Sequence, residues 1–96
     1  MSLRFEFDGR KSRVNERKHG VGFEEAESAF YDPNARVMHD AEHSSEEDRF
    51  VLLGLSAQCR MLVVCHCYRE DEEVIRIISA RKASRQEEAQ YEEFCR

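Results

Sequence analysis

The sequence predicts one small α+β domain, built on an antiparallel sheet that carries two N-terminal helices and a C-terminal helix on one face. With 96 residues, the chain is long enough for one hydrophobic core and too short for a second domain, so we expect residues 1–96 to form a single unit. Apolar residues follow strand periodicity in some segments and helical periodicity in others. Their order is strand, two helices, strands, helix, which is typical of layered α+β folds.

The N-terminal third contains a short strand and two helices. Phe5–Phe7 alternates apolar and polar residues as a strand does, and Asp8 is placed to cap the following helix. We expect this helix over about Gly9–His19, with Gly20 as its left-handed C-terminal cap. A second short helix is predicted over Phe23–Phe30, because its apolar residues recur at three- and four-residue spacing.

The rest of the chain is predicted to form a sheet and a last helix. We expect a strand over Ala35–His39, a solvated loop over Asp40–Asp48, and a helix after Ser84, which forms a capping box with Glu87. Between them, three apolar runs are joined by connectors that are too short for parallel crossovers, which predicts an antiparallel meander. The three runs are Phe50–Ser56, Met61–Tyr68 and Val74–Ala80.

The charges alternate in blocks along a chain whose net charge is -5. The segment Val74–Gln86 carries four basic residues and no acid, between acidic segments on both sides. Such a block predicts a surface for phosphate groups in spite of the acidic total. No stretch has the roughly 20 apolar residues of a membrane helix and the N-terminus lacks the apolar core of a secretion signal, so we expect a cytoplasmic protein with reduced cysteines and no membrane contact.

A symmetric hairpin over the connector Arg69–Glu73 would pair His66 with Arg76 and place Tyr68 on the same exposed face. A histidine exchanges protons near neutral pH and an arginine holds a phosphate through two donors, so this pair predicts cleavage of RNA phosphodiesters. The alternative is a solvated cross-strand pair without catalytic function.

A second group of basic residues follows within a few residues of Arg76. Arg81, Lys82 and Arg85 lie where the last strand turns into a helix N-terminus, and Arg69 and Tyr68 extend the group, with the tyrosine ring available to stack on a base. We predict catalytic roles for His66, Arg76 and Arg81, and RNA binding by Lys82, Tyr68, Arg69 and Arg85. The alternative is ordinary surface charge, with Arg81 paired to a nearby acid.

Two patterns resemble metal sites, Cys65-His66-Cys67 and His39-x-x-x-His43. On a strand, Cys65 and Cys67 face away from His66, and no second pair of cysteines completes a zinc site. We therefore expect no metal and no cofactor, and we expect the thiols to be structural rather than nucleophilic.

Several ordered motifs resemble those of the BrnT toxins and together span about residues 4 to 93. They are Phe5-Glu6-Phe7-Asp8, Lys18-His19-Gly20-Val21, Phe23-Glu24-Glu25-Ala26, Arg49-Phe50-Val51-Leu52-Leu53-Gly54-Leu55-Ser56 and Ile75-Arg76-Ile77-Ile78-Ser79-Ala80-Arg81-Lys82-Ala83.

The resemblance implies a RelE-like ribonuclease toxin of a type II toxin-antitoxin system that stops translation by cutting RNA. It also implies a BrnA-type antitoxin encoded alongside the toxin, a possible toxin-antitoxin heterotetramer, and contact with operator DNA only through that complex. Arg76, Arg81 and Lys82 match the basic residues of the family motif, and His66 and Arg69 fall in a segment where the family usually has a histidine and polar residues.

The sequence departs from the family pattern at three places. Gly22 stands where a serine or threonine usually caps the second helix, Cys59 stands where a glycine usually forms a hairpin turn, and the last helix is more acidic than usual. Two other functions stay open. One, which these departures favour, is an inactive module that only binds an antitoxin and helps it to grip DNA. The other, which rests on the cysteines rather than on the departures, is a metal sensor.

Overall fold

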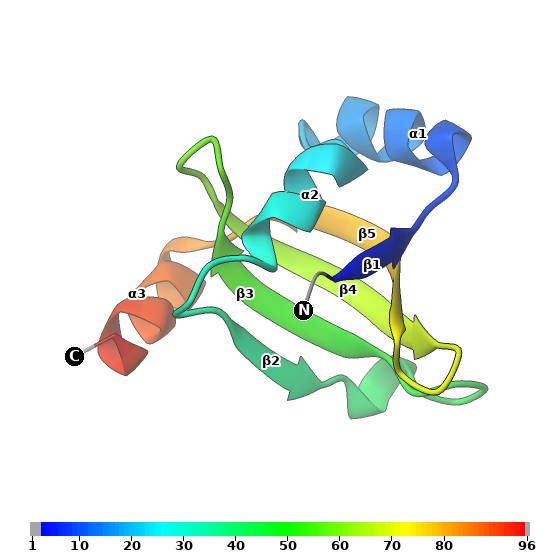
Figure 1. The fold of residues 1–96 in the computed structure, drawn as a ribbon. Helices are drawn as coiled ribbons and strands as arrows, with labels where there is room; N and C mark the ends of the chain where they lie inside the picture. The colour runs from blue at the N-terminus through cyan, green and yellow to red at the C-terminus, as the bar shows by residue number, and fades with distance from the viewer. Residues whose placement is uncertain (1–2, 96) are drawn as a thin grey trace.

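The computed structural model describes residues 3–95 and shows an α+β fold around one five-stranded sheet (Figure 1). Residues 1 and 2, at the N-terminus of the predicted 1–96 domain, and residue 96, at its C-terminus, lie outside the described residues. None of the described helices is long and apolar enough to cross a membrane. The elements in chain order are β1 (Arg4–Glu6), α1 (Gly9–His19), α2 (Phe23–Ala29), β2 (Arg36–His39), the 3-10 turn η1 (Ala41–His43), β3 (Phe50–Leu55), β4 (Met61–Arg69), β5 (Val74–Lys82) and α3 (Arg85–Phe94).

The caps of α1 and α2 explain where these helices begin and end. The Asp8 carboxylate accepts a hydrogen bond from the backbone N–H of Arg10 at 2.8 Å, and Gly20 ends α1 with a φ of 74°, as predicted. At the start of α2, Gly22 offers no side-chain cap. The hydroxyl of Ser12, on α1, instead accepts from the backbone N–H of Phe23 at 2.9 Å. The first turn of α2 is therefore capped by the neighbouring helix.

The sheet is mixed rather than purely antiparallel. Its strand order is β1-β5-β4-β3-β2. β3 to β5 form the antiparallel meander that was predicted, and β2 pairs antiparallel with β3 at the other edge. β1, however, lies parallel to β5, with Arg4 opposite Val74 and Glu6 opposite Arg76. The predicted antiparallel sheet is wrong at this edge. Parallel neighbours need a long crossover, and the helices and strands between β1 and β5 supply it.

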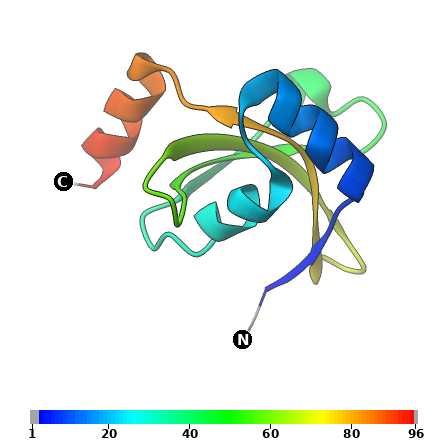
Figure 2. The same ribbon diagram turned by 90° about the horizontal axis from the view of Figure 1, so that it is seen from above.

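Alternate residues of the strands divide the molecule into two sides. We call the side that packs against α1 and α2 the inner face, where Leu52, Leu62, Val64 and Ile77 form the main core with Phe23. The opposite side is the outer face. The expectation that all three helices pack on one face is wrong, because α3 packs on the outer face. Figure 2 shows α3 at the far end of the molecule from α1.

The packing of α3 depends on one buried tyrosine. Tyr91 contacts Leu53 and Val63, which alternate with the core residues of the inner face, and its hydroxyl donates a hydrogen bond to the Asp32 carboxylate at 2.6 Å. Burial and the neighbouring Asp32 charge raise the pKa of Tyr91, so this hydroxyl stays protonated and continues to donate. α3 therefore covers one end of the outer face and leaves the other end accessible.

The hairpin between β3 and β4 is fixed to α2 by an ion pair. Arg60 donates through Nε to Glu25 Oε2 at 2.8 Å, and this contact with Arg60 lowers the pKa of the nearly buried Glu25 carboxyl. In the turn itself, Cys59 has a φ of 61°, the left-handed conformation that favours the glycine expected there. Gly54 of β3 lies so close to α2 that a Cβ would come within 2.9 Å of the Ala29 carbonyl oxygen.

Candidate nucleic-acid interface

The register between β4 and β5 differs by one residue from the predicted register. His66 pairs with Ile77 rather than with Arg76. β4 continues through Arg69, so the turn consists of Glu70–Glu73 and the pairing starts one residue later than predicted. His66 therefore lies on the inner face and Arg76 on the outer face. The predicted face shared by His66 and Arg76 is wrong.

His66 is fully buried among aromatic rings of the inner face. Its ring centroid lies 4.8 Å from that of Phe30 and 5.3 Å from that of Tyr68. Nδ1 lies 3.1 Å from the Val64 carbonyl oxygen, which can only accept, so Nδ1 donates and Nε2 accepts from the Tyr68 hydroxyl at 3.2 Å. Burial lowers the pKa of His66 and favours the neutral ring. These contacts indicate a packing role, and the predicted catalytic role of His66 has no support from its surroundings.

Tyr68 also lies on the inner face, at its rim. It lines a small cavity together with Phe50 and three carboxylates, those of Glu47, Asp48 and Glu72. Carboxylates repel a phosphate backbone. Stacking of this ring on an RNA base therefore remains a prediction that the surrounding charge disfavours.

Arg69 and Arg76 do come together on the outer face. Both guanidinium groups lie near the same carboxylate, since Glu6 Oε1 is 3.2 Å from Arg76 Nη1 and 4.0 Å from Arg69 Nε. One carboxylate cannot neutralise two guanidinium groups, so positive charge remains available for an anion. The two arginines line a cavity of about 140 Å³ whose other polar walls are Arg49, Lys11 and Glu47.

A larger groove of about 270 Å³ adjoins this cavity. Its floor is largely apolar, and its rim carries His19, His43, Arg49 and Arg81. Arg49 and Ile78 line both the cavity and the groove, so the two are continuous. We call the combined depression the outer groove. It joins an apolar floor to several cationic groups, which suits a nucleotide with its base and phosphate.

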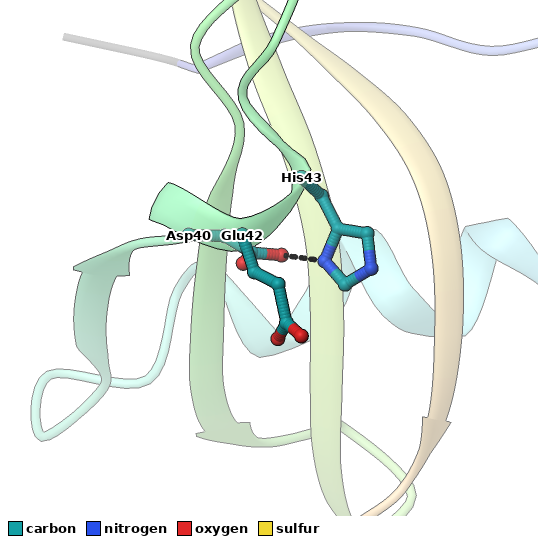
Figure 3. A group of neighbouring side chains, drawn as sticks. All are labelled: Asp40, Glu42 and His43. Carbon is teal, nitrogen blue, oxygen red and sulfur yellow. Dashed lines mark hydrogen bonds and ion pairs between the residues drawn. The ribbon is translucent and has the colours of Figure 1, made fainter.

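One histidine on the rim of the outer groove is oriented by a carboxylate. Nδ1 of His43 lies 2.9 Å from Asp40 Oδ2, and since a carboxylate accepts, Nδ1 carries the proton (Figure 3). The other ring nitrogen, Nε2, points away from Asp40. An imidazole held in this way presents a basic nitrogen to a substrate, which is the arrangement required of a general base. His43 ends the turn η1 and Asp40 immediately precedes it, and this turn lies on the outer side of the sheet.

Arg81 lines the outer groove, but its guanidinium group is paired with an acidic side chain of α3. Its Nη1 and Nη2 donate to the two carboxylate oxygens of Glu87 at 2.8 and 2.9 Å. This contact lowers the pKa of Glu87 to about 2. The alternative that Arg81 pairs with a nearby acid is confirmed. A phosphate must compete with Glu87 for this guanidinium group.

The remaining predicted residues lie away from the outer groove. Lys82 is the last residue of β5 and pairs with Leu62 of the inner-face core, and Arg85 begins α3; both are exposed. The predicted continuous group from Arg76 to Arg85 is therefore divided by the strand alternation and by the turn into α3.

The possible metal ligands gather only in part. Among residues 3–95, one group of three or more has its ligand atoms within 4.8 Å of one another, Asp40, Glu42 and His43. His39 pairs instead with Asp48 at 3.1 Å. Cys65 and Cys67 occupy the outer face, opposite to the inner-face His66, and burial raises the pKa of both thiols. The expected absence of a metal stays a prediction.

Sequence reasoning missed the groups that form the rim of the outer groove. The patterns give no role to Arg49, although it begins one of the family motifs, and they mark His43 only as a metal ligand. The available signal was the spacing of Asp40 and His43, because residues three apart in one helical turn lie on the same side. Lys11 and His19 could not be placed without the packing of α1 against β5.

The fold and the outer groove together define a small α+β protein with a cationic depression on the outer face of its sheet. A family model described as the ribonuclease toxin BrnT of type II toxin-antitoxin systems matches residues 7–87, and the chain belongs to this BrnT family. The fold is similar to the crystal structure of the Brucella abortus ribonuclease toxin BrnT, with a TM-score of 0.64 and 23% sequence identity over 88% of this chain and 100% of that one. No curated protein sequence matches the chain.

Proposed function

We propose that the protein is a RelE-like endoribonuclease that cuts RNA in the outer groove and thereby inhibits translation. The observation that carries this proposal is the position of Arg49, which joins the cavity of Arg69 and Arg76 to the groove of His43. Groups that hold a phosphate and a group that moves a proton thus meet in one depression. Membership of the family of ribonuclease toxins supports the same activity.

The proposed reaction is transfer of the phosphodiester to the neighbouring ribose hydroxyl. His43 Nε2 takes the proton of the 2′-hydroxyl, whose oxygen attacks phosphorus while the bond from phosphorus to the 5′-oxygen breaks. His19, on the same rim, returns a proton to the leaving 5′-oxygen. Arg49 and Arg76 stabilise the negative charge that develops on the phosphate. The products are a 2′,3′-cyclic phosphate and a 5′-hydroxyl, and the steps use no metal.

The predicted residues receive graded roles in this scheme. Arg76 and Arg69 bind the phosphate, because they are partly exposed and share one carboxylate. Arg81 binds RNA when Glu87 is displaced from it. Lys82, at the end of β5, and Arg85, at the start of α3, contribute only to the positive field of this region.

A type II family implies an antitoxin partner. We propose a BrnA-type antitoxin that covers the outer groove, forms a heterotetramer with the toxin and provides the contact with operator DNA. The expected cytoplasmic location belongs to the same proposal, since both RNA and antitoxin would be met there.

The experiment compares two histidines that are four residues apart, His39 at the end of β2 and His43 at the end of η1, each paired with an aspartate. His43→Ala removes the ring on the groove rim, and His39→Ala removes the ring that pairs with Asp48. Purified variants act on a mixed-sequence RNA in the presence of EDTA, and the cleaved ends are mapped. We expect His43→Ala to slow cleavage about 10² to 10⁴-fold and His39→Ala to match the wild type. Equal rates for all three proteins would refute the assigned base, and loss of wild-type cleavage in EDTA would refute the metal-independent scheme.

One observation favours the inactive binding module as a second candidate. Glu87 neutralises Arg81 beside the groove, and α3 carries three further acids, Glu88, Glu92 and Glu93. The test adds wild-type protein in stoichiometric excess to RNA. If the RNA stays intact and the protein still binds its antitoxin, this candidate is favoured over the enzyme.

A further inference from the structure

α1 completes the part of the β5 edge that lies beyond the β1 pairing. β1 pairs with Val74–Arg76, and further along β5 the side chain of Asn15 takes the place of a neighbouring strand. Its Nδ2 donates to the Ala80 carbonyl oxygen at 2.7 Å, and its Oδ1 accepts from the Ala80 N–H at 3.2 Å. A strand neighbour satisfies an edge residue by the same exchange of donor and acceptor. The contact fixes α1 alongside β5.

The position of Asn15 determines which side chains of α1 border the strand. Residues four before, three after and four after share its side of the helix, and these are Lys11, Lys18 and His19. Together with Ile78 they line a groove of about 340 Å³ between α1 and β5, which we call the seam. Lys11 and His19 also line the two parts of the outer groove. The seam therefore opens into the outer groove.

α1 is strongly basic in a chain whose net charge is -5. It carries five lysine and arginine side chains and one acid, Glu16. Within residues 3–95, none of these five bases forms an ion pair. Basic side chains that line a groove and have no acidic partners favour the binding of a polyanion.

The geometry points to a binding track for unpaired RNA, in which the seam holds the strand that continues from the phosphodiester cut in the outer groove. This inference rests on the proposed function. Lys11 and Lys18 are seven residues apart, about 10 Å along the helix axis, so they contact different phosphates of the strand. The floor of the seam, which includes Val14 and Ile78, is apolar and accepts bases.

The experiment uses two double variants that change the net charge equally on opposite sides of α1. Lys11→Ala with Lys18→Ala removes the two lysines that line the seam and keeps Arg10 there, whereas Arg13→Ala with Arg17→Ala removes two basic side chains that face away from Asn15. The probe is a single-stranded RNA of about 12 nucleotides whose ribose 2′-hydroxyls are all methylated. Such a probe binds and cannot be cut, so binding is measured apart from catalysis.

Binding is measured over a range of salt concentrations. Each phosphate contact on a single strand contributes about 0.7 to the slope of log affinity against log salt, so the loss of two contacts should reduce the slope of the seam variant by about 1.4. The arginine variant should keep the wild-type slope. Equal salt slopes for the two double variants would overturn the track. It would also be overturned if the seam variant lost affinity for duplex DNA alone and kept its affinity for the single-stranded RNA.

Cleavage of an unmodified RNA by the same proteins separates this inference from the proposed function. If the wild-type protein cuts the RNA and the seam variant keeps the wild-type salt slope, the track is refuted and the proposed enzyme activity is not. A changed slope in a protein that cuts nothing would support the track and refute the enzyme.

Discussion

Glu87→Gln tests whether α3 restrains the outer groove, because this residue has two functions in the structure. It accepts two hydrogen bonds from Arg81, and it also accepts from the backbone N–H of Ser84 in the capping box. Glutamine keeps the shape and can still accept from Ser84, whereas it loses the negative charge. The substitution therefore isolates the ion pair from the helix cap.

The magnitude follows from the pKa of Glu87, which falls from an ordinary value of 4.5 to about 2. Such a shift would correspond to about 3.4 kcal/mol for an unscreened pair. The Arg81 side chain is 47% exposed, so solvent screening reduces the contribution to about 1 kcal/mol. Because the pKa is lower in the folded state, this stabilisation is fully present above pH 4.5 and is lost as the pH falls toward 2.

Urea denaturation of both proteins between pH 7 and pH 2.5 measures this difference. We expect Glu87→Gln to unfold about 1 kcal/mol more easily at pH 7, and the two curves to converge at the acidic end. RNA binding should change in the opposite direction, because Arg81 is released for phosphate. A stability difference that is independent of pH would refute the ion pair as its cause, and unchanged RNA affinity would refute the restraint on the groove.

Three further substitutions test other parts of the structure. Asn15→Ala should cost about 3 kcal/mol in urea denaturation, because it leaves the buried polar groups of Ala80 without partners, and a loss below about 1 kcal/mol would contradict this. Cys59→Gly should raise the free energy of unfolding by about 1 kcal/mol, since glycine adopts a φ of 61° without strain; a lower melting temperature would show otherwise. His66→Phe should reduce the loss of stability below pH 6.5, because the depressed pKa means that the unfolded chain binds the proton more readily. The same variant should keep its RNA cleavage, and a folded but inactive protein would restore the predicted catalytic role of His66.

Features set by neighbouring residues were predictable from the sequence. The start and end of α1 follow from Asp8 and Gly20, and the start of α3 follows from the reciprocal bonds of Ser84 and Glu87. Each of these signals acts within one helical turn. The antiparallel order of β3 to β5 was predictable as well, because short connectors restrict the topology.

The register of the last hairpin was not predictable, and a large part of the predicted site depended on it. Asp71 and Glu72 form the turn with φ values of 56° and 69°, without the asparagine or glycine that usually marks such a turn. The sequence therefore contains no signal for where β4 ends. A shift of one residue moved His66 into the core, since successive side chains of a strand face opposite sides.

Contacts between distant segments were also beyond the sequence patterns. The parallel pairing of β1 with β5, the side on which α3 packs and the approach of η1 to the outer groove all depend on tertiary packing. Arg49 and His43 acquire a common surface only through that packing. Their composition and spacing alone do not distinguish them from solvated loop residues.

The Ser12 hydroxyl that caps α2 links the opening of two helices. A seven-residue helix such as α2 is too short to persist alone, and its first turn depends on a group that α1 must hold in position. Fraying of α1 near Ser12 exposes the N–H of Phe23 at the same moment. The amides of both helices should consequently exchange with deuterium as one cooperative unit, more slowly than the amides of the loop before β3. Ser12→Ala should raise the exchange rate in α2 as well as in α1.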